Sequence, residues 1–565
     1  MRRGTISEVA KVNVRRGADV LLEILESEGV RYIFGNPGTT ELPLMDALVR
    51  APALQYILAL QEASAVAMAD GYAQAARRPG FLNLHTAGGL GHGMGNLLNA
   101  NVSQTPLVVT AGQQDLRHTL TDPLLFGDLV QIASPAVKWA REVASADQLP
   151  ILVRRAFHDA SAAPTGPVFL ALPMDVLEEM TTTSIAEVST IDRKAVAGSL
   201  DLLADHLAAI RPGKLALIAG DEVSASNAAP EAVLLAEAFG APVYGSSWPL
   251  HIPFPTAHPL WAGNLPTKAS EIAETLKPYD AIFALGGKSL ITLLYTEGSA
   301  VPPGCDVFQM SADVRDLGRT YATKLSVLGD IKASLKALLP LLVQRLAARA
   351  EAYAGLCAIA RRKQEARRGR LNAAADAALD APLTAPIVAA REIVRAIGPE
   401  IAIVDEAPAT TFHLRGFLDS ASTRQYSFSR GGALGWGMPA AVGFSLGLDR
   451  APVVSIVGDG AALYSPQALW TAIHERLPVT FVIINNRQYN ILKKVLSSLP
   501  HYSSVRENRF IAMDLVAPAI DFLALASAMG VAARRVERAA DIAPAIAAGV
   551  ASGVANLIEI PVGTA

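Results

Sequence analysis

The sequence is poor in cysteine, with only Cys305 and Cys357 among its 565 residues. Two cysteines cannot supply the several cross-links of a disulfide-stabilised extracellular protein, nor the cysteine set of a structural zinc or iron–sulfur site. The cysteine content therefore fits a reducing compartment. The hydrophobic fraction of 51% is enough for the chain to be stabilised by a large apolar core instead.

Charge and long apolar runs are also scarce. Charged residues make up 18% of the chain and the formal net charge is −3, which excludes the basic surface of a protein that binds nucleic acid or an acidic membrane. No segment reaches the roughly 18 uninterrupted apolar residues of a membrane span, and the basic N-terminus is not followed by the apolar part of a secretory signal. We therefore expect a cytoplasmic protein with small-molecule partners, whose first dozen or so residues form an extension.

Strand-like and helix-like segments alternate along most of the chain, which predicts doubly wound parallel sheets. The expected strands fall into three groups, at 32–34, 81–85, 107–111 and 168–172, at 215–219, 242–244, 281–285 and 306–310, and at 401–405, 453–458, 479–485 and 557–560. The chain is longer than one core usually supports. We therefore predict three α/β domains, at 14–185, 190–345 and 386–565, and a helical linker at 346–385.

The segment 453–486 combines two motifs that suit a phosphate and a metal. A buried strand ends in Gly458-Asp459-Gly460, a helix follows, and a second strand ends in Asn486, 27 residues after Asp459. Glycines beside an aspartate let backbone N–H groups approach a phosphate, while the carboxylate holds a hard cation and Asn486 adds a neutral oxygen ligand. Each motif alone could be an ordinary turn or strand end. Together they predict a diphosphate and metal site at the carboxyl edge of a parallel sheet.

Glu62 is a carboxyl group at the start of an otherwise apolar helix. The helix dipole alone explains a glutamate at this place, so the position by itself leaves a structural and a functional interpretation open.

With these motifs, the chain resembles the thiamine-diphosphate-dependent decarboxylase and acetolactate-synthase superfamily over nearly its whole length, and within it benzoylformate decarboxylase. The matching segments are 34–43, 58–63, 70–75, 83–87, 110–114 and 137–139. The resemblance implies a pyrimidine-binding, a central Rossmann-like and a diphosphate-binding domain, with thiamine diphosphate and Mg²⁺ as cofactors. It also implies a homodimer or homotetramer with active sites at the subunit interface.

The resemblance implies a role for each candidate residue. Glu62 protonates the aminopyrimidine ring, which favours removal of the proton from C2 of the cofactor. His85 faces the substrate, and Thr39 stands where benzoylformate decarboxylase has a serine that binds the substrate carboxylate. Mg²⁺ is bound by Asp459, Asn486 and the carbonyl of Gln488. The further cofactor contacts are Leu434, as a wedge under the bent cofactor, and Gly432, Gly460, Ala461, Tyr464, Tyr489, Asn490 and Ile491, the last two through backbone N–H groups.

The chain departs from benzoylformate decarboxylase at three places, one of which is the loop Asn490-Ile491-Leu492, which resembles that of synthase-like members. The decarboxylase has a second histidine that donates a proton, but none stands near Leu293, so Tyr295 is either a substitute donor or a wall of the pocket. Pro408 and Ala409 replace two hydroxyl residues near the diphosphate, where Thr410 and Thr411 follow. His92, in the glycine-rich run 88–93, is expected either to be structural or peripheral, or to touch the rim of the pocket.

The expected function is the non-oxidative decarboxylation of an aromatic or apolar 2-keto acid to an aldehyde and CO₂. The alternative is a carboligase, synthase or 2-hydroxyacyl lyase of the acetolactate-synthase type. No Gly-x-Gly-x-x-Gly marks a flavin in the central domain, although flavin sites of this superfamily lack a sharp sequence mark. A non-catalytic scaffold is a third possibility, and the presence together of Glu62, Asp459 and Asn486 argues against it.

Overall fold

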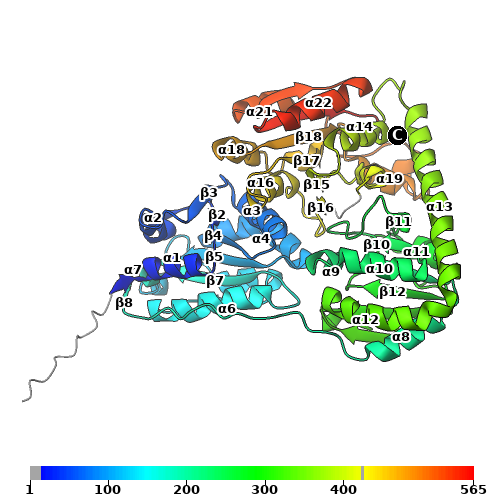
Figure 1. Ribbon diagram of the computed structural model, residues 1–565. Coiled ribbons are helices and arrows are strands. Elements are labelled where there is room, and N and C mark those ends of the chain that lie inside the picture. The colour runs from blue at the N-terminus through cyan, green and yellow to red at the C-terminus, as the bar shows by residue number, and fades with distance from the viewer. Residues whose placement is uncertain (1–13, 421–425, 565) are drawn as a thin grey trace, which may run out of the picture. The chain divides into compact units, whose positions relative to one another are not determined.

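The computed structural model describes residues 14–420 and 426–564, so the expected N-terminal extension lies outside the described residues. The chain forms two compact units, one of Met1–Asp70 and Arg78–Thr190, the other of Gly71–Arg77 and Ile191–Ala565. The first holds one six-stranded sheet and the second holds two (Figure 1). None of the described helices has the length and apolarity that a membrane span requires.

In the first unit, six parallel strands have the order β3-β2-β4-β5-β7-β6. They are β2 (Tyr32–Gly35), β3 (Gln55–Leu58), β4 (Gly80–His85), β5 (Leu107–Gln113), β6 (Ala140–Glu142) and β7 (Val168–Pro173). Strands β5 and β7 are buried and almost continuously apolar, as strands covered on both faces must be. Helices α1 (Gly17–Ser27), α2 (Leu42–Leu48) and α6 (Leu149–Ser161) share one apolar core with this sheet.

A short antiparallel pair joins the two ends of this unit. β1 (Arg15–Arg16) pairs with β8 (Met180–Thr181), and the N–H of Gly17 donates to the carbonyl of Glu179 over 2.9 Å. The strand that precedes the sheet of this unit and the strand that follows it therefore lie side by side.

The central sheet of the second unit has the order β11-β10-β9-β12-β13-β14, all parallel. Its strands are β9 (Leu215–Ala219), β10 (Val243–Gly245), β11 (Trp261–Asn264), β12 (Ala281–Leu285), β13 (Asp306–Ser311) and β14 (Leu325–Leu328). Helices α8 (Leu200–Ala209), α10 (Ala229–Phe239) and α12 (Ile331–Leu346) pack on one face, and α11 (Ala269–Leu276) packs on the other.

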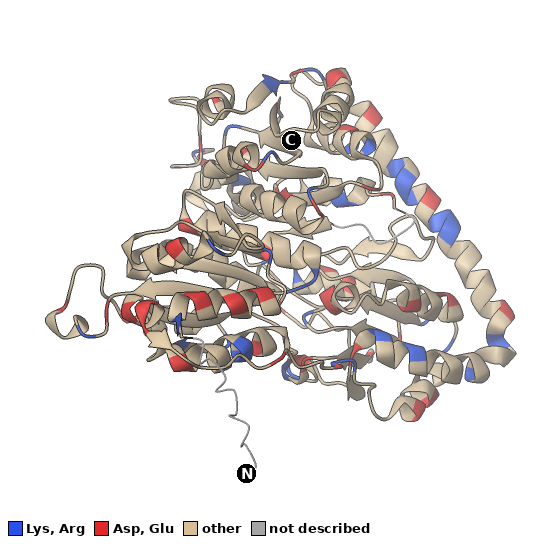
Figure 2. Cartoon of the chain, turned by 60° about the vertical axis from the view of Figure 1, so that its left-hand side comes forward, with Lys and Arg blue, Asp and Glu red and all other residues tan. Residues whose placement is uncertain are grey.

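The C-terminal sheet has the order β16-β15-β17-β18-β20-β19, also all parallel. Its strands are β15 (Ala402–Glu406), β16 (Tyr426–Phe428), β17 (Val453–Gly458), β18 (Val479–Asn485), β19 (Ala532–Arg535) and β20 (Asn556–Pro561). The long helix α13 (Ala350–Ala377) precedes this sheet and lies within the range 346–385 that we predicted to be a helical linker. Its basic residues lie in its middle part, at 361–370 (Figure 2).

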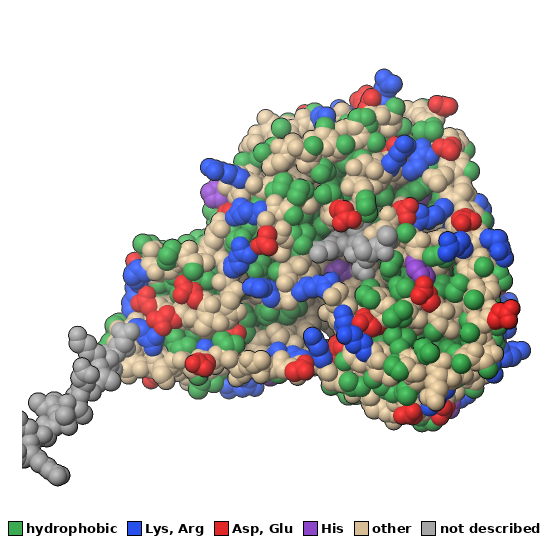
Figure 3. All heavy atoms as spheres, in the orientation of Figure 1, with side chains coloured by type: hydrophobic (Ala, Val, Ile, Leu, Met, Phe, Trp, Pro, Cys, Tyr) green, Lys and Arg blue, Asp and Glu red, His purple; other side chains and the backbone are tan. Residues whose placement is uncertain are grey.

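The predicted fold class of three doubly wound parallel sheets is confirmed. All the expected strands are present, with ends that differ by at most two residues. The prediction missed β3, β6, β11, β14, β16 and β19, which are the edge strands of the three sheets, and the pair β1 and β8. On the face in Figure 3, acidic and basic side chains are interspersed without a field of one sign, in keeping with the low net charge.

Candidate active site

Glu62 is the first residue of α3 (Glu62–Ala76), shortly after β3, and is 9% exposed. Two side chains reach its carboxylate: Asn36 Nδ2 donates to Oε1 over 3.2 Å, and His92 Nδ1 lies 3.2 Å from Oε2. A Cβ on Gly89 would lie 3.1 Å from Cγ of Glu62, so this glycine leaves room for the carboxyl side chain. The sequence leaves His92 open between a structural role and a contact at the rim of the pocket, and the structure places its ring beside the candidate activating carboxylate.

His85 is the last residue of β4, and a buried carboxylate holds its ring. Nδ1 lies 2.8 Å from Glu41 Oε2 and 3.1 Å from Thr40 Oγ1. Glu41 is 1% exposed and also accepts from the backbone N–H of Gly38 over 2.9 Å. The hydrogen bond that the His85 ring donates to Glu41 raises the pKa of His85 against the opposing effect of burial, and the charge of Glu62 also raises it. The carboxylate therefore holds a proton on Nδ1 and favours the imidazolium.

Two glycines allow the close approach of Glu41 and His85. A Cβ on Gly38 would lie 2.3 Å from the His85 ring, and a Cβ on Gly112 would lie 2.0 Å from Glu41 Oε1. Both distances are far below van der Waals contact, so any side chain at either position would separate the pair. Sequence reasoning missed Glu41, although it lies within the matched segment 34–43.

Thr39 lies in the 3₁₀ turn η1 (Thr39–Glu41) and is exposed. The neighbouring Thr40 is the residue that is buried and that contacts both His85 and Glu41. The role of Thr39 at the substrate carboxylate stays a prediction. Glu62 follows β3, Thr39 follows β2, and His85 is the last residue of β4. Since these three parallel strands are neighbours, the three residues lie at the same edge of one sheet.

Asp459 begins α17 (Asp459–Ala462) directly after β17 and is 3% exposed. Its Oδ1 accepts the N–H of Gly460 over 2.9 Å, while Oδ2 is buried and has no hydrogen-bond partner among residues 14–420 and 426–564. Burial raises the pKa of Asp459 to about 6. A buried carboxylate oxygen without a partner is costly unless a cation binds it, so this oxygen fits a metal ligand. The described residues contain no cluster of three or more His, Cys, Asp or Glu that could hold a metal instead.

The loop after β18, residues 486–488, is here called the metal loop. Asn486 Oδ1 accepts the N–H of Gln488 over 3.1 Å and keeps a second lone pair. Arg487, between them, has a φ of 58°, a left-handed conformation that costs energy for a residue other than glycine. Asn485 holds this turn by accepting the N–H of Arg487 over 3.0 Å, and it donates to buried Glu559 over 2.7 Å.

Leu434 lies in a loop whose backbone conformation requires glycine on either side of it. Gly432 and Gly435 have φ values of 82° and 89°, and a Cβ on Gly435 would lie 2.6 Å from Cβ of Tyr464. Glu406, the last residue of β15, accepts the backbone N–H groups of Trp436 and Gly437 over 3.1 and 2.8 Å.

Glu406 is a second residue that sequence reasoning missed. It is buried, and burial raises its pKa to about 7. Strands β15, β17 and β18 are neighbours, so Glu406, Asp459 and the metal loop lie at one edge of the C-terminal sheet. The sequence signal that could have identified Glu406 is an acidic residue at the end of an apolar strand.

The other predicted cofactor residues lie close to this edge. The ring of Tyr489 packs against Gly460, where a Cβ would come within 2.6 Å of it. The N–H of Asn490 donates to the carbonyl of Gln488 over 2.8 Å, so it is engaged within the loop rather than free for a diphosphate. Ala461 is buried, Tyr464 is exposed, and Ile491 follows in α19 (Asn490–Ser497).

The structure also describes the residues near Leu293 and those after Pro408 and Ala409, where the chain departs from the decarboxylase pattern. Tyr295 is 91% exposed within this chain, and Leu293 is exposed too. Thr411 is buried and its hydroxyl donates to the carbonyl of Ala407 over 2.9 Å, while Thr410 is buried beside it. The Thr411 hydroxyl therefore donates its proton to the backbone rather than to a diphosphate.

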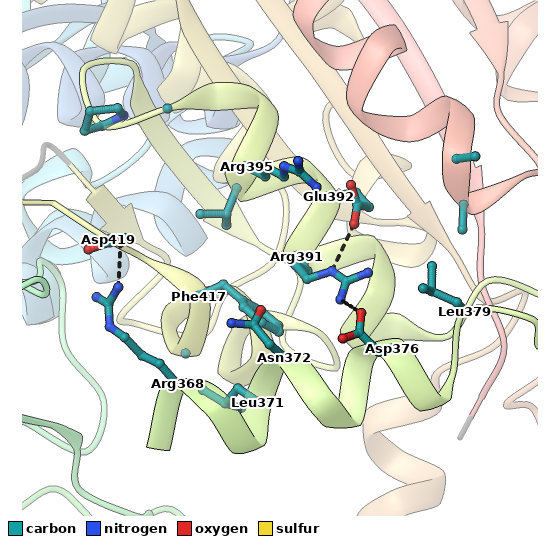
Figure 4. A pocket seen from close by; sticks show the side chains of 16 residues that line it. Arg368, Leu371, Asn372, Asp376, Leu379, Arg391, Glu392, Arg395, Phe417 and Asp419 are labelled. Atoms are coloured by element: carbon teal, nitrogen blue, oxygen red, sulfur yellow. Dashed lines mark hydrogen bonds and ion pairs between the residues drawn. The ribbon is translucent and has the colours of Figure 1, made fainter. Parts of the chain in front are cut away.

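A cavity of about 740 Å³ lies among α13, α14 (Pro386–Ile397), α15 (Thr411–Phe417) and α22 (Ala539–Ala551) (Figure 4). Arg391 pairs there with Asp376 over 2.6 Å and with Glu392 over 2.9 Å, and Arg368 pairs with Asp419. None of the predicted cofactor residues lines this cavity. It is not the candidate active site.

Comparisons with known proteins match all three domains. Residues 15–131 match the family described as thiamine pyrophosphate enzyme, N-terminal TPP binding domain, residues 202–338 its central domain, and residues 410–560 its C-terminal TPP binding domain. Benzoylformate decarboxylase of Pseudomonas aeruginosa is 32% identical, with 96% of this chain and 98% of that protein covered. The acetolactate synthase isozyme 3 large subunit of Escherichia coli (strain K12) is 26% identical, with 85% and 83% covered. The structure of a thiamine diphosphate-dependent 4-hydroxybenzoylformate decarboxylase of Rhodococcus jostii RHA1 superposes with a TM-score of 0.83 at 27% identity, covering 97% and 99%.

Proposed function

The chain belongs to the thiamine pyrophosphate enzyme family, and from this we propose that it is a Mg²⁺-dependent decarboxylase of an aromatic or apolar 2-keto acid, releasing an aldehyde and CO₂. The observation that carries the choice of decarboxylation is the Glu41–His85 pair. Decarboxylation to an aldehyde ends with delivery of a proton to carbon, and an imidazolium stabilised by a buried carboxylate is suited to that step.

The residues present fit the cofactor. Asp459 Oδ2, the Asn486 side chain and the Gln488 carbonyl would hold Mg²⁺, because they offer the oxygen ligands that this ion prefers. Glu62 would contact the aminopyrimidine of the cofactor, and Leu434 would pack against the cofactor. When bound, thiamine diphosphate supplies a nucleophilic carbon and accepts the electrons left by the departing CO₂.

The side chains of the first unit hold and move protons. Glu62 would exchange a proton with the aminopyrimidine ring, while Asn36 and His92 contact its carboxylate oxygens and orient that group. Glu41 fixes the His85 ring through Nδ1, so the opposite nitrogen, Nε2, is the atom that can deliver a proton to the substrate. Glu41 acts through His85 and is therefore a positioning residue.

We assign residues 14–185 to pyrimidine binding, 190–345 to a central domain and 386–565 to diphosphate binding, joined by the linker 346–385. The active form in this proposal is a cytoplasmic homodimer or homotetramer in which Glu62 of one subunit faces the Asp459 site of its partner.

A panel of benzoylformate, phenylpyruvate and pyruvate tests the proposal. The purified protein should release CO₂ and the matching aldehyde from an aromatic acid, and only with both thiamine diphosphate and Mg²⁺. Activity that is unaffected by removal of either cofactor would contradict the proposal.

The second candidate is a carboligase or synthase of the acetolactate-synthase type. Two observations favour it: the acetolactate synthases among the relatives and the absence of a histidine at Leu293. Chromatography of the same reactions separates the candidates, because a synthase yields a coupled hydroxyketone or acetohydroxy acid in place of free aldehyde.

A further inference from the structure

The metal loop is joined to a later segment of the chain, residues 513–515. The N–H of Tyr489 donates to the carbonyl of Met513 over 2.8 Å, and the N–H of Leu515 donates to the carbonyl of Arg487 over 2.8 Å. These bonds flank an isolated antiparallel bridge between Gln488 and Asp514. The later segment therefore lies along the metal loop as a short strand would.

Lys493 ties the same two segments together through side chains. Its Nζ donates to Gln488 Oε1 over 2.6 Å and to Asp514 Oδ1 over 2.5 Å. The ammonium also lies 5.5 Å from the centroid of the Phe510 ring, within cation–π range. The side chain is only 16% exposed, so these contacts are partly shielded from water.

The conformation of the metal loop explains why contacts with Lys493 would stabilise it. Arg487 is held in a left-handed conformation, with a φ of 58°, directly before the residue whose carbonyl would bind the metal. A loop held in such a conformation by a few contacts relaxes when one of them is lost. Groups that orient metal ligands without touching the metal commonly change its affinity by about 10- to 100-fold.

We propose that Lys493 is a positioning residue for the metal. By binding the Gln488 side chain and Asp514 together, it holds the metal loop, which carries Asn486 and the Gln488 carbonyl, in one conformation. The proposal rests on the proposed Mg²⁺-dependent function and adds to it a residue outside the set of metal ligands.

The test compares Lys493→Met with Lys494→Met, a matched control because Lys494 is the next residue of α19 and is exposed. Binding of thiamine diphosphate is followed by calorimetry at a series of Mg²⁺ concentrations. The Mg²⁺ needed for half-maximal binding should rise about tenfold in Lys493→Met and stay unchanged in Lys494→Met. Lys493→Arg should restore part of the difference, because it keeps the charge.

Asp514→Asn gives an independent measurement should Lys493→Met fold poorly. It should raise the Mg²⁺ requirement as Lys493→Met does, and the double variant should be no worse than either single one, since both act through one contact. Equal Mg²⁺ requirements in Lys493→Met and Lys494→Met would overturn the proposal. So would weak thiamine diphosphate binding that persists at saturating Mg²⁺, because it would mean that Lys493 binds the diphosphate itself. If the unaltered protein shows no Mg²⁺-dependent binding, the proposed function fails as well, which is a distinct result.

Discussion

At the scale of single residues, the Asp459 carboxyl group makes the metal site sensitive to pH. Burial raises its pKa to about 6 in the metal-free protein, and a protonated carboxyl cannot bind Mg²⁺ through the same oxygen. Apparent Mg²⁺ affinity should therefore be constant above pH 7 and fall by roughly tenfold per pH unit below about 6. Calorimetric Mg²⁺ titrations from pH 5 to 8 measure this. An affinity that is flat across the range would contradict Asp459 as a ligand.

The Glu41–His85 pair predicts the direction in which the pKa of His85 changes when Glu41 is replaced. The hydrogen bond to Glu41 raises the pKa of His85, so Glu41→Gln should lower it. If the protonated ring is the active form, loss of kcat on raising the pH should begin at a lower pH in this variant. NMR titration of the His85 ring measures the pKa directly, and Glu26→Gln, at an exposed position of α1, is the control. A His85 pKa that does not move would show that Glu41 has no effect on the ring.

At the scale of elements, Glu406 connects the end of β15 to the start of α16 (Gly437–Gly447). Burial raises its pKa from the ordinary 4.5 to about 7. Its contribution to stability is therefore fully present below pH 4.5 and is lost as the pH rises through 7.

Glu406→Gln should remove this pH dependence, because an amide does not ionise. The melting temperature of the cofactor-free variant, relative to the unaltered protein, should be higher at pH 8 than at pH 4.5. Scanning calorimetry at both values measures the difference. Glu400→Gln, which changes an exposed carboxyl, should show none, and the same pH dependence in both variants would refute the assignment.

The elements that the sequence did and did not predict differ in one physical respect. The central strands, such as β9 and β18, are covered on both faces and read as continuous apolar runs. The edge strands are shorter or more polar: β6 is Ala-Arg-Glu and β19 is Ala-Ala-Arg-Arg. One side of an edge strand has no partner in the sheet, so its sequence is less constrained and gives a weaker pattern.

The same distinction holds for the candidate site. Asp459 and Asn486 were predicted because their strand contexts and spacing are local features of the sequence. Glu41 and Lys493 were missed because what marks them is a contact with a residue distant in sequence, with His85 at 44 positions from Glu41 and Asp514 at 21 positions from Lys493. Such contacts depend on strand order, which the pattern of one sequence does not specify.

At the scale of the whole molecule, we predict that activity requires at least a dimer, since the proposal places Glu62 and the Asp459 site on different subunits. Sedimentation of the active protein should show a dimer or tetramer. Mixing inactive Glu62→Gln with inactive Asp459→Ala, under conditions that allow subunits to exchange, should restore part of the activity, because some sites then combine two intact halves. A fully active monomer would contradict the prediction.

The pairing of β1 with β8 has a consequence for the ancestry and engineering of the molecule. Because Arg15 and Arg16 lie against Thr181 and Met180, the polypeptide between them is a closed loop with adjacent ends. A segment of that kind can be transplanted into another protein, or circularly permuted by linking its old ends and opening a new pair elsewhere, without tearing its sheet. Recombination at these ends would move Glu62 and His85 together, and would carry with them Gly71–Arg77, at the C-terminal end of α3, which belong to the second unit.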